Sequence, residues 1–303
     1  MKQSTTNNVD VKGALANKGA FHGFFSPSPL PLLPLSLFFL IFFLWPIGAL
    51  TGNAFKSNEG AFTFSNITML FQDPYRLAFK NSITLGLISG LVGAIPGLAI
   101  AMAIEKQGSQ TLKKFIASIS GVLANTGGVP LAFMFLAAFG PAGLVISALK
   151  SVGIDLYGLG FTLFSFTGLV IVYAYFQIPI MVIVVTPALS SLRKEWKDSA
   201  ANLGASKFQY WKKVGLPILM PSFFACYLLL FASAFSAFAT ARALTVGNIA
   251  LVPLQIGSLV DGNVTINQAN LGYALAFGMI VISLIAMIPY IWIQNRTAKW
   301  QTR

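Results

Sequence analysis

Six apolar windows constrain the fold of this chain more than any other feature of its sequence. The windows contain no charged residue and lie at residues 31–51, 81–104, 117–139, 162–186, 218–240 and 271–294. An α-helix needs about 20 residues to cross roughly 30 Å of hydrocarbon, and each window is long enough. Only 9% of all residues are charged, whereas soluble domains carry about 25%. The expected fold is therefore an all-α membrane protein with six transmembrane helices.

The basic residues predict how these helices are oriented. Six spans place both termini on one side, which would carry fifteen of the 20 basic residues. The fifteen are Lys2, Lys12, Lys18, Lys106, Lys113, Lys114, Arg193, Lys194, Lys197, Lys207, Lys212, Lys213, Arg296, Lys299 and Arg303, and the other five are Lys56, Arg76, Lys80, Lys150 and Arg242. Because cytoplasmic loops are enriched in Lys and Arg, the termini and the loop at 193–217 are expected to be cytoplasmic. The net charge of +12 reflects this topology and gives no support to nucleic-acid binding.

The same windows predict the domain organisation. We expect a flexible cytoplasmic tail at residues 1–26, a six-span domain at 27–295 and a second cytoplasmic tail at 296–303. The first 20 residues are polar, so no cleavable signal peptide is expected. The chain has one cysteine, Cys226, and one histidine, His22. This supply predicts no disulfide framework, no metal site and no catalytic residues.

Two apolar segments contain helix-breaking residues. Residues 125–130 (NTGGVP) lie inside the third window, where they either end a helix in a turn or interrupt a helix beside a translocation path. Irregular backbone at membrane depth requires cover from protein or a water-filled cavity. Residues 243–260 are semi-apolar, but a seventh span there would place the termini on opposite sides. We expect this segment to enter the protein from the outer face without crossing.

The second window carries a stripe of glycines. Gly86, Gly90, Gly93 and Gly97 recur at spacings of three and four residues, which places them on one helical face. Small residues on such a face let a neighbouring helix approach closely. We therefore expect this window to pack against other helices.

The loop at 193–217 is a charged, helix-forming insert between two apolar windows. Trp196, Ala200 and Leu203 fall at i, i+4 and i+7, which predicts one apolar stripe on a helix. Gly204 follows where a helix end favours a left-handed residue, and residues 206–209 (SKFQ) match a capping box that begins a second helix. That helix is expected to end before Pro217. The loop either only anchors the topology or docks another protein, and its small residues and tryptophans favour docking.

The spacing in this loop resembles the EAA loop of permease subunits of binding-protein-dependent ABC importers. That family's pattern is Glu-Ala-Ala, three residues, Gly, nine residues, Ile-x-Leu-Pro. Here DSA at 198–200 is followed by three residues, Gly204, nine residues and VGLP at 214–217. The spacing agrees throughout, while positions 198, 199 and 214 depart from the family's residues. The resemblance covers residue 75 to the C-terminus and is greatest to polyamine, aminoalkylphosphonate, thiamine, ferric-ion and sulfate or molybdate importers.

The resemblance implies a type I permease architecture in the bacterial inner membrane and a coupling helix that fits a cytoplasmic ATP-binding subunit. By position, the docking element would comprise Asp198, Ser199, Ala200, Ala201, Gly204 and Ala205, and Leu216 and Pro217 would hinge it to the fifth span. ATP and Mg would be bound by the partner, because this chain has no GxxxxGK[ST] phosphate loop and is not expected to be an enzyme. A second permease subunit, identical or homologous, an external solute-binding protein and membrane lipid complete the implied partners.

Polar residues in or beside the spans are the candidates for the substrate path. They are Asn125, Thr126, Gln177, Ser236, Thr240 and Arg242, with Tyr173, Tyr175 and Ser233 near them. Each polar side chain could instead make a helix-packing hydrogen bond, and Arg242 could instead be an anchor at the membrane interface.

The expected substrate is a small hydrophilic solute of the spermidine/putrescine or 2-aminoethylphosphonate type, with ferric-ion, thiamine or sulfate/molybdate solutes as alternatives. A path for a polycation should present carboxylates, yet only Asp155 and Asp261 are near, which favours an anionic or zwitterionic solute. An autonomous carrier or channel is the alternative of another class, and it would require ionisable residues in the spans. An intramembrane enzyme would require paired His, Asp or Glu, which this sequence supplies poorly.

Overall fold

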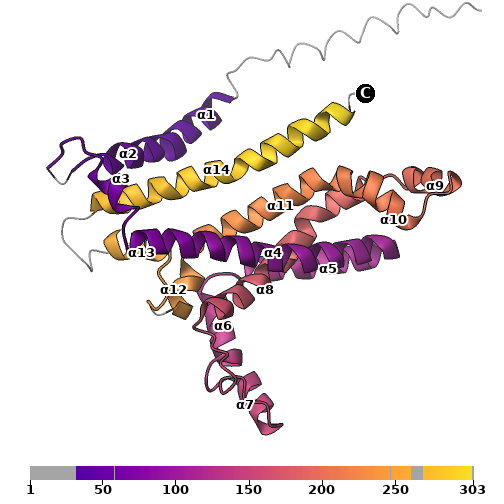
Figure 1. The fold of residues 1–303 in the computed structure, drawn as a ribbon, viewed down its shortest axis with the longest axis horizontal. Helices are drawn as coiled ribbons and strands as arrows, with labels where there is room; N and C mark the ends of the chain where they lie inside the picture. The colour runs from indigo at the N-terminus through magenta and orange to yellow at the C-terminus, as the bar shows by residue number, and fades with distance from the viewer. Residues whose placement is uncertain (1–31, 58, 246, 261–268, 302–303) are drawn as a thin grey trace, which may run out of the picture. The chain divides into compact units, whose positions relative to one another are not determined.

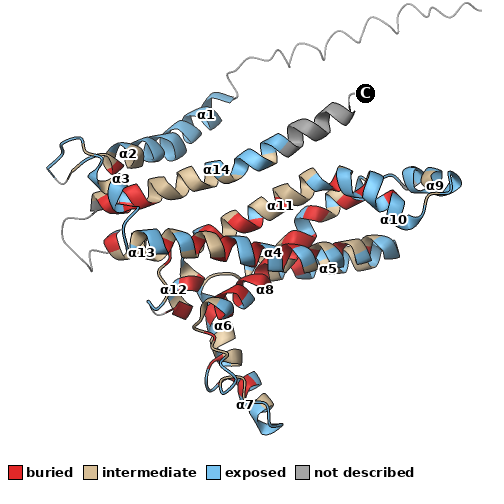
Figure 2. Ribbon diagram, viewed as in Figure 1, coloured by how far each residue is buried: buried red, intermediate tan, exposed pale blue. Residues whose placement is uncertain are grey.

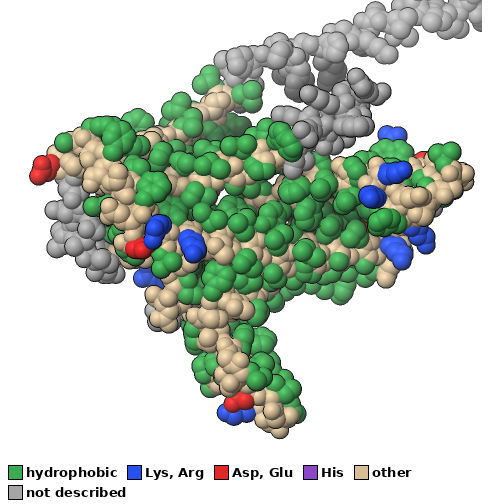
Figure 3. Space-filling model, viewed as in Figure 1, with side chains coloured by type: hydrophobic (Ala, Val, Ile, Leu, Met, Phe, Trp, Pro, Cys, Tyr) green, Lys and Arg blue, Asp and Glu red, His purple; other side chains and the backbone are tan. Residues whose placement is uncertain are grey.

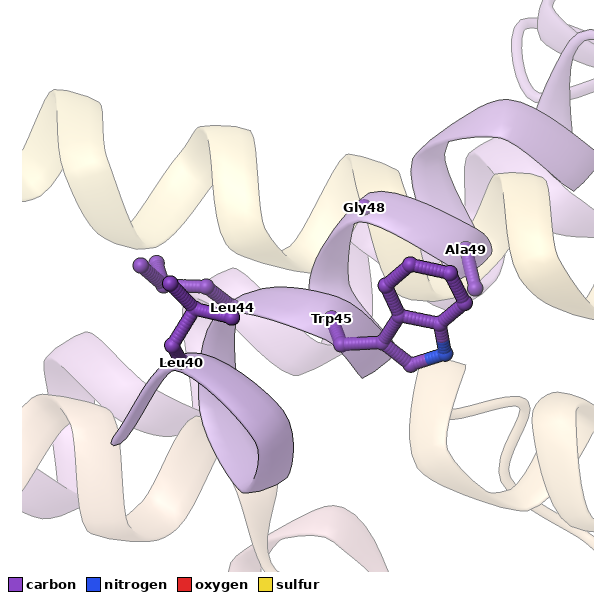
Figure 4. A pocket seen from close by; sticks show the side chains of 5 residues that line it. All are labelled: Leu40, Leu44, Trp45, Gly48 and Ala49. Atoms are coloured by element: carbon purple, nitrogen blue, oxygen red, sulfur yellow. The ribbon is translucent and has the colours of Figure 1, made fainter. Parts of the chain in front are cut away.

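The computed structural model describes residues 32–57, 59–245, 247–260 and 269–301, in two units that meet between Ala49 and Leu50. His22, Asp261, the tail at 1–26 and the last two residues lie outside the described part. The described part of the first unit comprises α1 (Leu33–Phe39), the π-helical turn η2 (Leu40–Leu44) and the start of α2 (Trp45–Ala54). Every described residue of this unit is exposed, and Figure 4 shows a shallow apolar depression on it lined by Leu40, Leu44, Trp45, Gly48 and Ala49.

The second unit is built from helices, and no strand occurs among its described residues. Its long helices are α4 (Tyr75–Gln107), α8 (Phe166–Ser190), α11 (Leu216–Ser236) and α14 (Ala269–Gln301). Shorter helices precede or connect them (Figure 1): α3 (Ser65–Met69) precedes α4, and the connecting helices are α5 (Gln110–Asn125), α6 (Val129–Phe139), α7 (Leu144–Ser151), α9 (Lys194–Asn202), α10 (Lys207–Tyr210), α12 (Ala239–Thr245) and α13 (Val252–Val260).

Six helical stretches of the described chain are long and apolar enough to cross a membrane, which confirms the expected fold class. They are Leu33–Ala54, Tyr75–Gln107, Val129–Ser151, Phe166–Ser190, Lys207–Ser236 and Asn270–Trp292. Five of them overlap the predicted windows closely. The third is displaced toward the C-terminus, for a reason that lies in the glycines at its start.

The third window is divided rather than continuous. Helix α5 ends at Asn125 and α6 begins at Val129, so the helix break predicted at 125–130 is confirmed, whereas its place beside a translocation path stays a prediction. Gly128 adopts φ +86°, a conformation that favours glycine, and Pro130 lies in the first turn of α6. The apolar stretch of spanning length therefore begins after the interruption and runs through α6 and α7.

The fifth window also ends earlier than predicted. Helix α11 ends at Ser236, Ala237 is extended, and Thr240 belongs to the separate helix α12. No glycine or proline marks this break, so no local sequence signal predicts it. Within residues 243–260, α13 has only nine residues, or about 14 Å of helix, which is too short to cross a membrane, as predicted. Entry of this segment from the outer face stays a prediction.

The core of the second unit lies where α4, α8 and α11 pack together (Figure 2). The glycine stripe on α4 explains this close approach. A Cβ added at Gly93 would lie 2.6 Å from the Cβ of Gln177, and one added at Gly97 would lie 2.6 Å from the Cβ of Met181, both on α8. At Gly86 an added Cβ would lie 2.8 Å from the Phe231 ring on α11. The stripe thus brings α4 against two helices at once.

Candidate functional site

The loop at 193–217 folds as two short helices that meet at Gly204. Helix α9 ends in two backbone hydrogen bonds: the Gly204 N–H donates to Ala201 O at 2.9 Å and the Ala205 N–H to Ala200 O at 3.0 Å. This is a Schellman end, which requires a left-handed residue, and Gly204 supplies it with φ +78°. The left-handed corner predicted from the sequence is confirmed.

The second helix of the loop begins with the predicted capping box. The Gln209 N–H donates to Ser206 Oγ at 3.2 Å, and the Ser206 N–H donates to Gln209 Oε1 at 2.8 Å. These bonds satisfy backbone donors that a helix start otherwise leaves to water. Both helices of the loop are therefore fixed by contacts within a few residues of sequence.

The loop presents apolar side chains outward. Leu203 is 87% exposed and Phe208 is 74% exposed, and no described residue of α9 is buried (Figure 2). Of the predicted docking residues, Ala200 and Ala205 are half-buried, and the exposed ones are Asp198, Ser199, Ala201 and Gly204. Lys and Arg side chains gather at the end of the molecule that carries this loop (Figure 3). The surface combines an apolar patch with a basic surround, which suits contact with another protein.

The loop is connected to α8 at its start, which we call the α8 arm, and to α11 at its end, which we call the α11 arm. The two connections differ. On one arm, α10 continues through the π-helical turn η3 (Trp211–Gly215) into α11, so that Lys207–Ser236 is helical throughout. The Leu216 N–H donates to Trp211 O, five residues back, and this wide turn carries the helix past Pro217, which has no N–H to donate. The prediction that the second helix ends before Pro217 is wrong. Leu216 and Pro217 are exposed residues inside a continuous helix.

On the other arm, residues 191–193 separate α9 from α8. At the end of α8, the Ser190 hydroxyl donates a hydrogen bond to Glu105 Oε2 at 3.2 Å. Lys113 Nζ lies 2.8 Å from the same carboxylate oxygen. This cluster joins the ends of α4, α5 and α8 beside the loop. Sequence reasoning missed it, because its members are distant in sequence and none belongs to a motif.

A second irregular region forms where two broken helices meet. The Gly128 N–H, at the start of α6, donates to Thr240 Oγ1 at 3.0 Å. The Thr240 hydroxyl donates in turn to Gly128 O at 3.1 Å. From α8, the Tyr173 hydroxyl lies 3.5 Å from Ala237 O, in the break between α11 and α12. We call this region the junction: residues 125–128 at one break and residues 236–242 at the other.

Most candidate path residues lie at the junction. The Asn125 and Thr126 side chains donate to carbonyl oxygens of their own helix, those of Gly121 at 2.8 Å and Val122 at 2.6 Å. Ser236 likewise donates to Ala232 O at 2.8 Å. The Arg242 guanidinium lies 5.5 Å from the centre of the Phe238 ring, and both side chains are exposed.

Gln177 lies apart from the junction residues. It is fully buried among α4, α8 and α11, where its Nε2 donates to Leu230 O at 3.2 Å and lies 3.3 Å from Ser89 Oγ. Its Nε2 makes the contacts of a helix-packing residue, while its buried Oε1 accepts no hydrogen bond from the described residues. Among the described residues, no cluster of His, Cys, Asp and Glu could hold a metal ion.

One charged group has a shifted titration outside the spanning helices. The pKa of Asp155, in the connection between α7 and α8, lies below its usual value because the Gly158 N–H donates to the carboxylate and the Lys150 ammonium lies 3.4 Å away. Asp155 stays ionised near neutral pH. The structure places it in neither the loop nor the junction.

Comparison with known proteins identifies relatives along most of the chain. A family model described as binding-protein-dependent transport system inner membrane component matches residues 93–299. The chain is 24% identical over 249 residues to the spermidine/putrescine transport system permease protein PotC of Escherichia coli K12, covering 80% of this chain and 86% of that protein. It is 25% identical over 270 residues to the ferric transport system permease protein FbpB of Actinobacillus pleuropneumoniae, covering 87% of this chain but only 38% of that protein.

A solved structure shares the fold. It is a bacterial alginate ABC transporter in complex with an alginate pentasaccharide-bound periplasmic protein, and its aligned chain superposes with a TM-score of 0.69 at 21% identity. The superposition covers 88% of this chain and 93% of that chain.

Proposed function

Because this chain belongs to the family of binding-protein-dependent transport system inner membrane components and is a permease subunit of an ABC importer, we propose that it moves a small hydrophilic solute across the bacterial inner membrane. The single observation that carries this proposal is the exposed loop at 193–217. This pair of short helices is folded, exposed to solvent and joined to a long apolar helix. It is therefore suited to receive motion from a soluble partner.

The partner is a cytoplasmic ATP-binding subunit, which holds ATP and Mg. Its groove receives α9 and the corner, through Asp198, Ser199, Ala200, Ala201, Gly204 and Ala205. Because α10, η3 and α11 form one helix of about 45 Å, displacement of the loop reaches the far end of α11 directly. In this proposal Leu216 and Pro217 transmit motion as part of that helix, instead of hinging it.

The path for the solute forms between two permease subunits, identical or homologous, and the junction lines it. Irregular backbone in a membrane protein is tolerated where it lines a cavity or is covered by protein, and the junction combines two such breaks with the exposed side chains of Asn125, Ser236 and Arg242. A solute-binding protein on the opposite face from the loop delivers the solute. A periplasmic protein is present in the solved alginate complex.

For the solute, we propose a compound with an anionic or zwitterionic group, of the 2-aminoethylphosphonate type before the spermidine/putrescine type. At the junction, the exposed side chain of Arg242 supplies a positive charge, which would attract an anionic group. Ferric-ion, thiamine and sulfate/molybdate solutes are the alternatives, and the relatives named above themselves carry different cargoes.

The test is purification of the intact complex, combined with a topology assay. An ATPase subunit should co-purify, and ATP should drive solute uptake in vesicles. In a Cys226→Ala background, Lys207→Cys should resist a membrane-impermeant maleimide in intact spheroplasts, while Glu59→Cys, exposed on the other side, should react. Labelling of Lys207→Cys from outside would overturn the topology. Uptake without any ATPase would favour the autonomous carrier or channel.

A further inference from the structure

The hydroxyl of Thr240 joins the two broken helices through two hydrogen bonds to Gly128. We infer that Thr240 is a positioning residue that ties the start of α6 to α12, directly after α11, so that α6 and the end of α11 move as one unit. The claim that motion of the loop is transmitted through Thr240 rests on the proposed function. The claim that Thr240 holds α6 and α12 together does not. This role differs from that of a substrate contact, because the hydroxyl is already engaged with backbone.

The tie is reciprocal and partly buried. Thr240 is 3% exposed, whereas Gly128, 112 residues away in sequence, is half-buried. Buried apolar residues adjoin the tie: Leu131 and Ala132 of α6, and Ala241 and Leu244 of α12, belong to one hydrophobic cluster. Water is therefore a poor substitute partner for the Thr240 hydroxyl.

Gly128 explains why a hydroxyl is required at position 240. Its N–H stands at the start of α6, where no carbonyl within the helix can accept it. Its carbonyl already accepts from the Ala132 N–H at 3.3 Å and has a second lone pair to offer. A hydroxyl accepts from the first group and donates to the second at once. Serine retains both bonds, whereas valine, with the same shape as threonine, retains neither.

The position of Thr240 gives the tie a mechanical consequence. Lys207–Ser236 is helical from the loop to the break, and only Ala237 and Phe238 separate it from α12. Motion that enters at α10 therefore arrives two residues from the helix that holds Thr240. Through Gly128 the same motion reaches α6, which is otherwise joined to α11 only through residues 140–215 of the chain.

The experiment measures the distance between α6 and α11 by spin labels in the full chain, purified with its ATPase in lipid nanodiscs. The labels replace the exposed residues Met134 and Leu229 in a Cys226→Ala background. Three variants are compared: Thr240→Val, Thr240→Ser and Thr245→Val. Thr245 is the matched control, since it is equally buried on the same helix but its hydroxyl donates to Ala241 O in its own helix at 2.9 Å.

With Thr240 intact, the distance distribution should be narrow and should keep its centre when ATP and Mg are added. Thr240→Val should raise the population of separated states by at least about fivefold, because it leaves the half-buried Gly128 N–H without this partner. The variant should also lower solute uptake per ATP hydrolysed. Thr240→Ser and Thr245→Val should behave as the unmodified chain does.

Each contrary outcome overturns part of the inference. If the distance distribution of Thr240→Val is identical to that of the unmodified chain, Thr240 does not tie the two helices. The same conclusion follows if Thr245→Val broadens the distribution equally. Broadening with unchanged uptake per ATP removes the role in transmission. If no ATPase co-purifies, the proposed function fails instead, and the distributions recorded without ATP still decide whether Thr240 ties the two helices.

Discussion

The loop at 193–217 and the junction are both interruptions between long helices, but they are held together in different ways. In the loop, the bonds that shape the Gly204 corner and the capping box join residues at most five positions apart. At the junction, Thr240 and Gly128 are 112 residues apart. The loop is exposed, while Thr240 is buried. One region is a self-contained exposed surface, and the other exists only once the helices have packed.

The way the loop is connected to its neighbouring helices also determines where its motion can go. The loop joins α11 through a continuous helix and joins α8 through a short non-helical link with a partly exposed ion pair behind it. We therefore expect changes in the loop corner and the α11 arm to have large effects on coupling. Changes on the α8 arm should have small ones.

The largest expected effect is that of Gly204→Val. A β-branched residue is strained at φ +78°, and its bulk would stand on the docking surface, where nothing now lies within 4 Å of the added Cβ. We expect uptake per ATP hydrolysed to fall by at least about tenfold, or roughly 1.4 kcal/mol of coupling, while the protein still inserts. Reconstituted vesicles with solute and phosphate assays measure this ratio.

Gly108→Val is the matched control for that variant. Gly108 has φ +69° and equally open surroundings, but it joins α4 to α5. The two variants should lose similar thermal stability, and only Gly204→Val should uncouple. Equal uncoupling by both would mean that backbone strain, and not the docking corner, is responsible.

The same contrast explains how far the sequence could predict the structure. The corner at Gly204 and the capping box at 206–209 were predictable because their bonds are local. The break at Gly128 was predictable from its glycines and proline. The break after Ser236 was not, because no residue there disfavours a helix and tertiary contacts such as the Tyr173 hydroxyl accompany it. Continuity through Pro217 was missed because a π-helical turn accommodates the proline.

The next effect concerns the packed body on which both regions depend. Gly93→Ala places a Cβ 2.6 Å from the Cβ of Gln177, and neither helix can yield without moving backbone. We expect a loss of about 1–3 kcal/mol in the free energy of unfolding, as for other overpacked sites. Gly121→Ala in α5 is the control, since its added Cβ meets nothing within 4 Å. Thermal unfolding in detergent should rank Gly93→Ala well below Gly121→Ala, and equal midpoints would contradict close packing of α4 on α8.

A smaller effect is expected on the α8 arm. Glu105→Gln removes the ion pair with Lys113. The side chain of Lys113 is 21% exposed and that of Glu105 is 32% exposed. Partly exposed pairs contribute at most about 1 kcal/mol, so uptake per ATP should change by less than about threefold. High salt should reproduce part of the change in the unmodified protein. A Glu105→Gln variant as uncoupled as Gly204→Val would show that α8 carries the motion, and the asymmetry between the arms would be wrong.

The smallest expected effect tests whether the junction, unlike the loop, meets the solute. Arg242 is exposed, lies two residues after Thr240 and packs on Phe238. If it faces the path, Arg242→Glu should repel an anionic or zwitterionic solute and lower uptake per assembled complex by about twofold. Lys80→Glu changes the charge equally at an exposed position on α4 and should leave that ratio unchanged. If Arg242 is an interface anchor, Arg242→Glu should reduce the amount of assembled complex while uptake per complex stays the same. Uptake normalised to complex therefore separates a gate from an anchor, and an unchanged ratio would leave the junction a mechanical element alone.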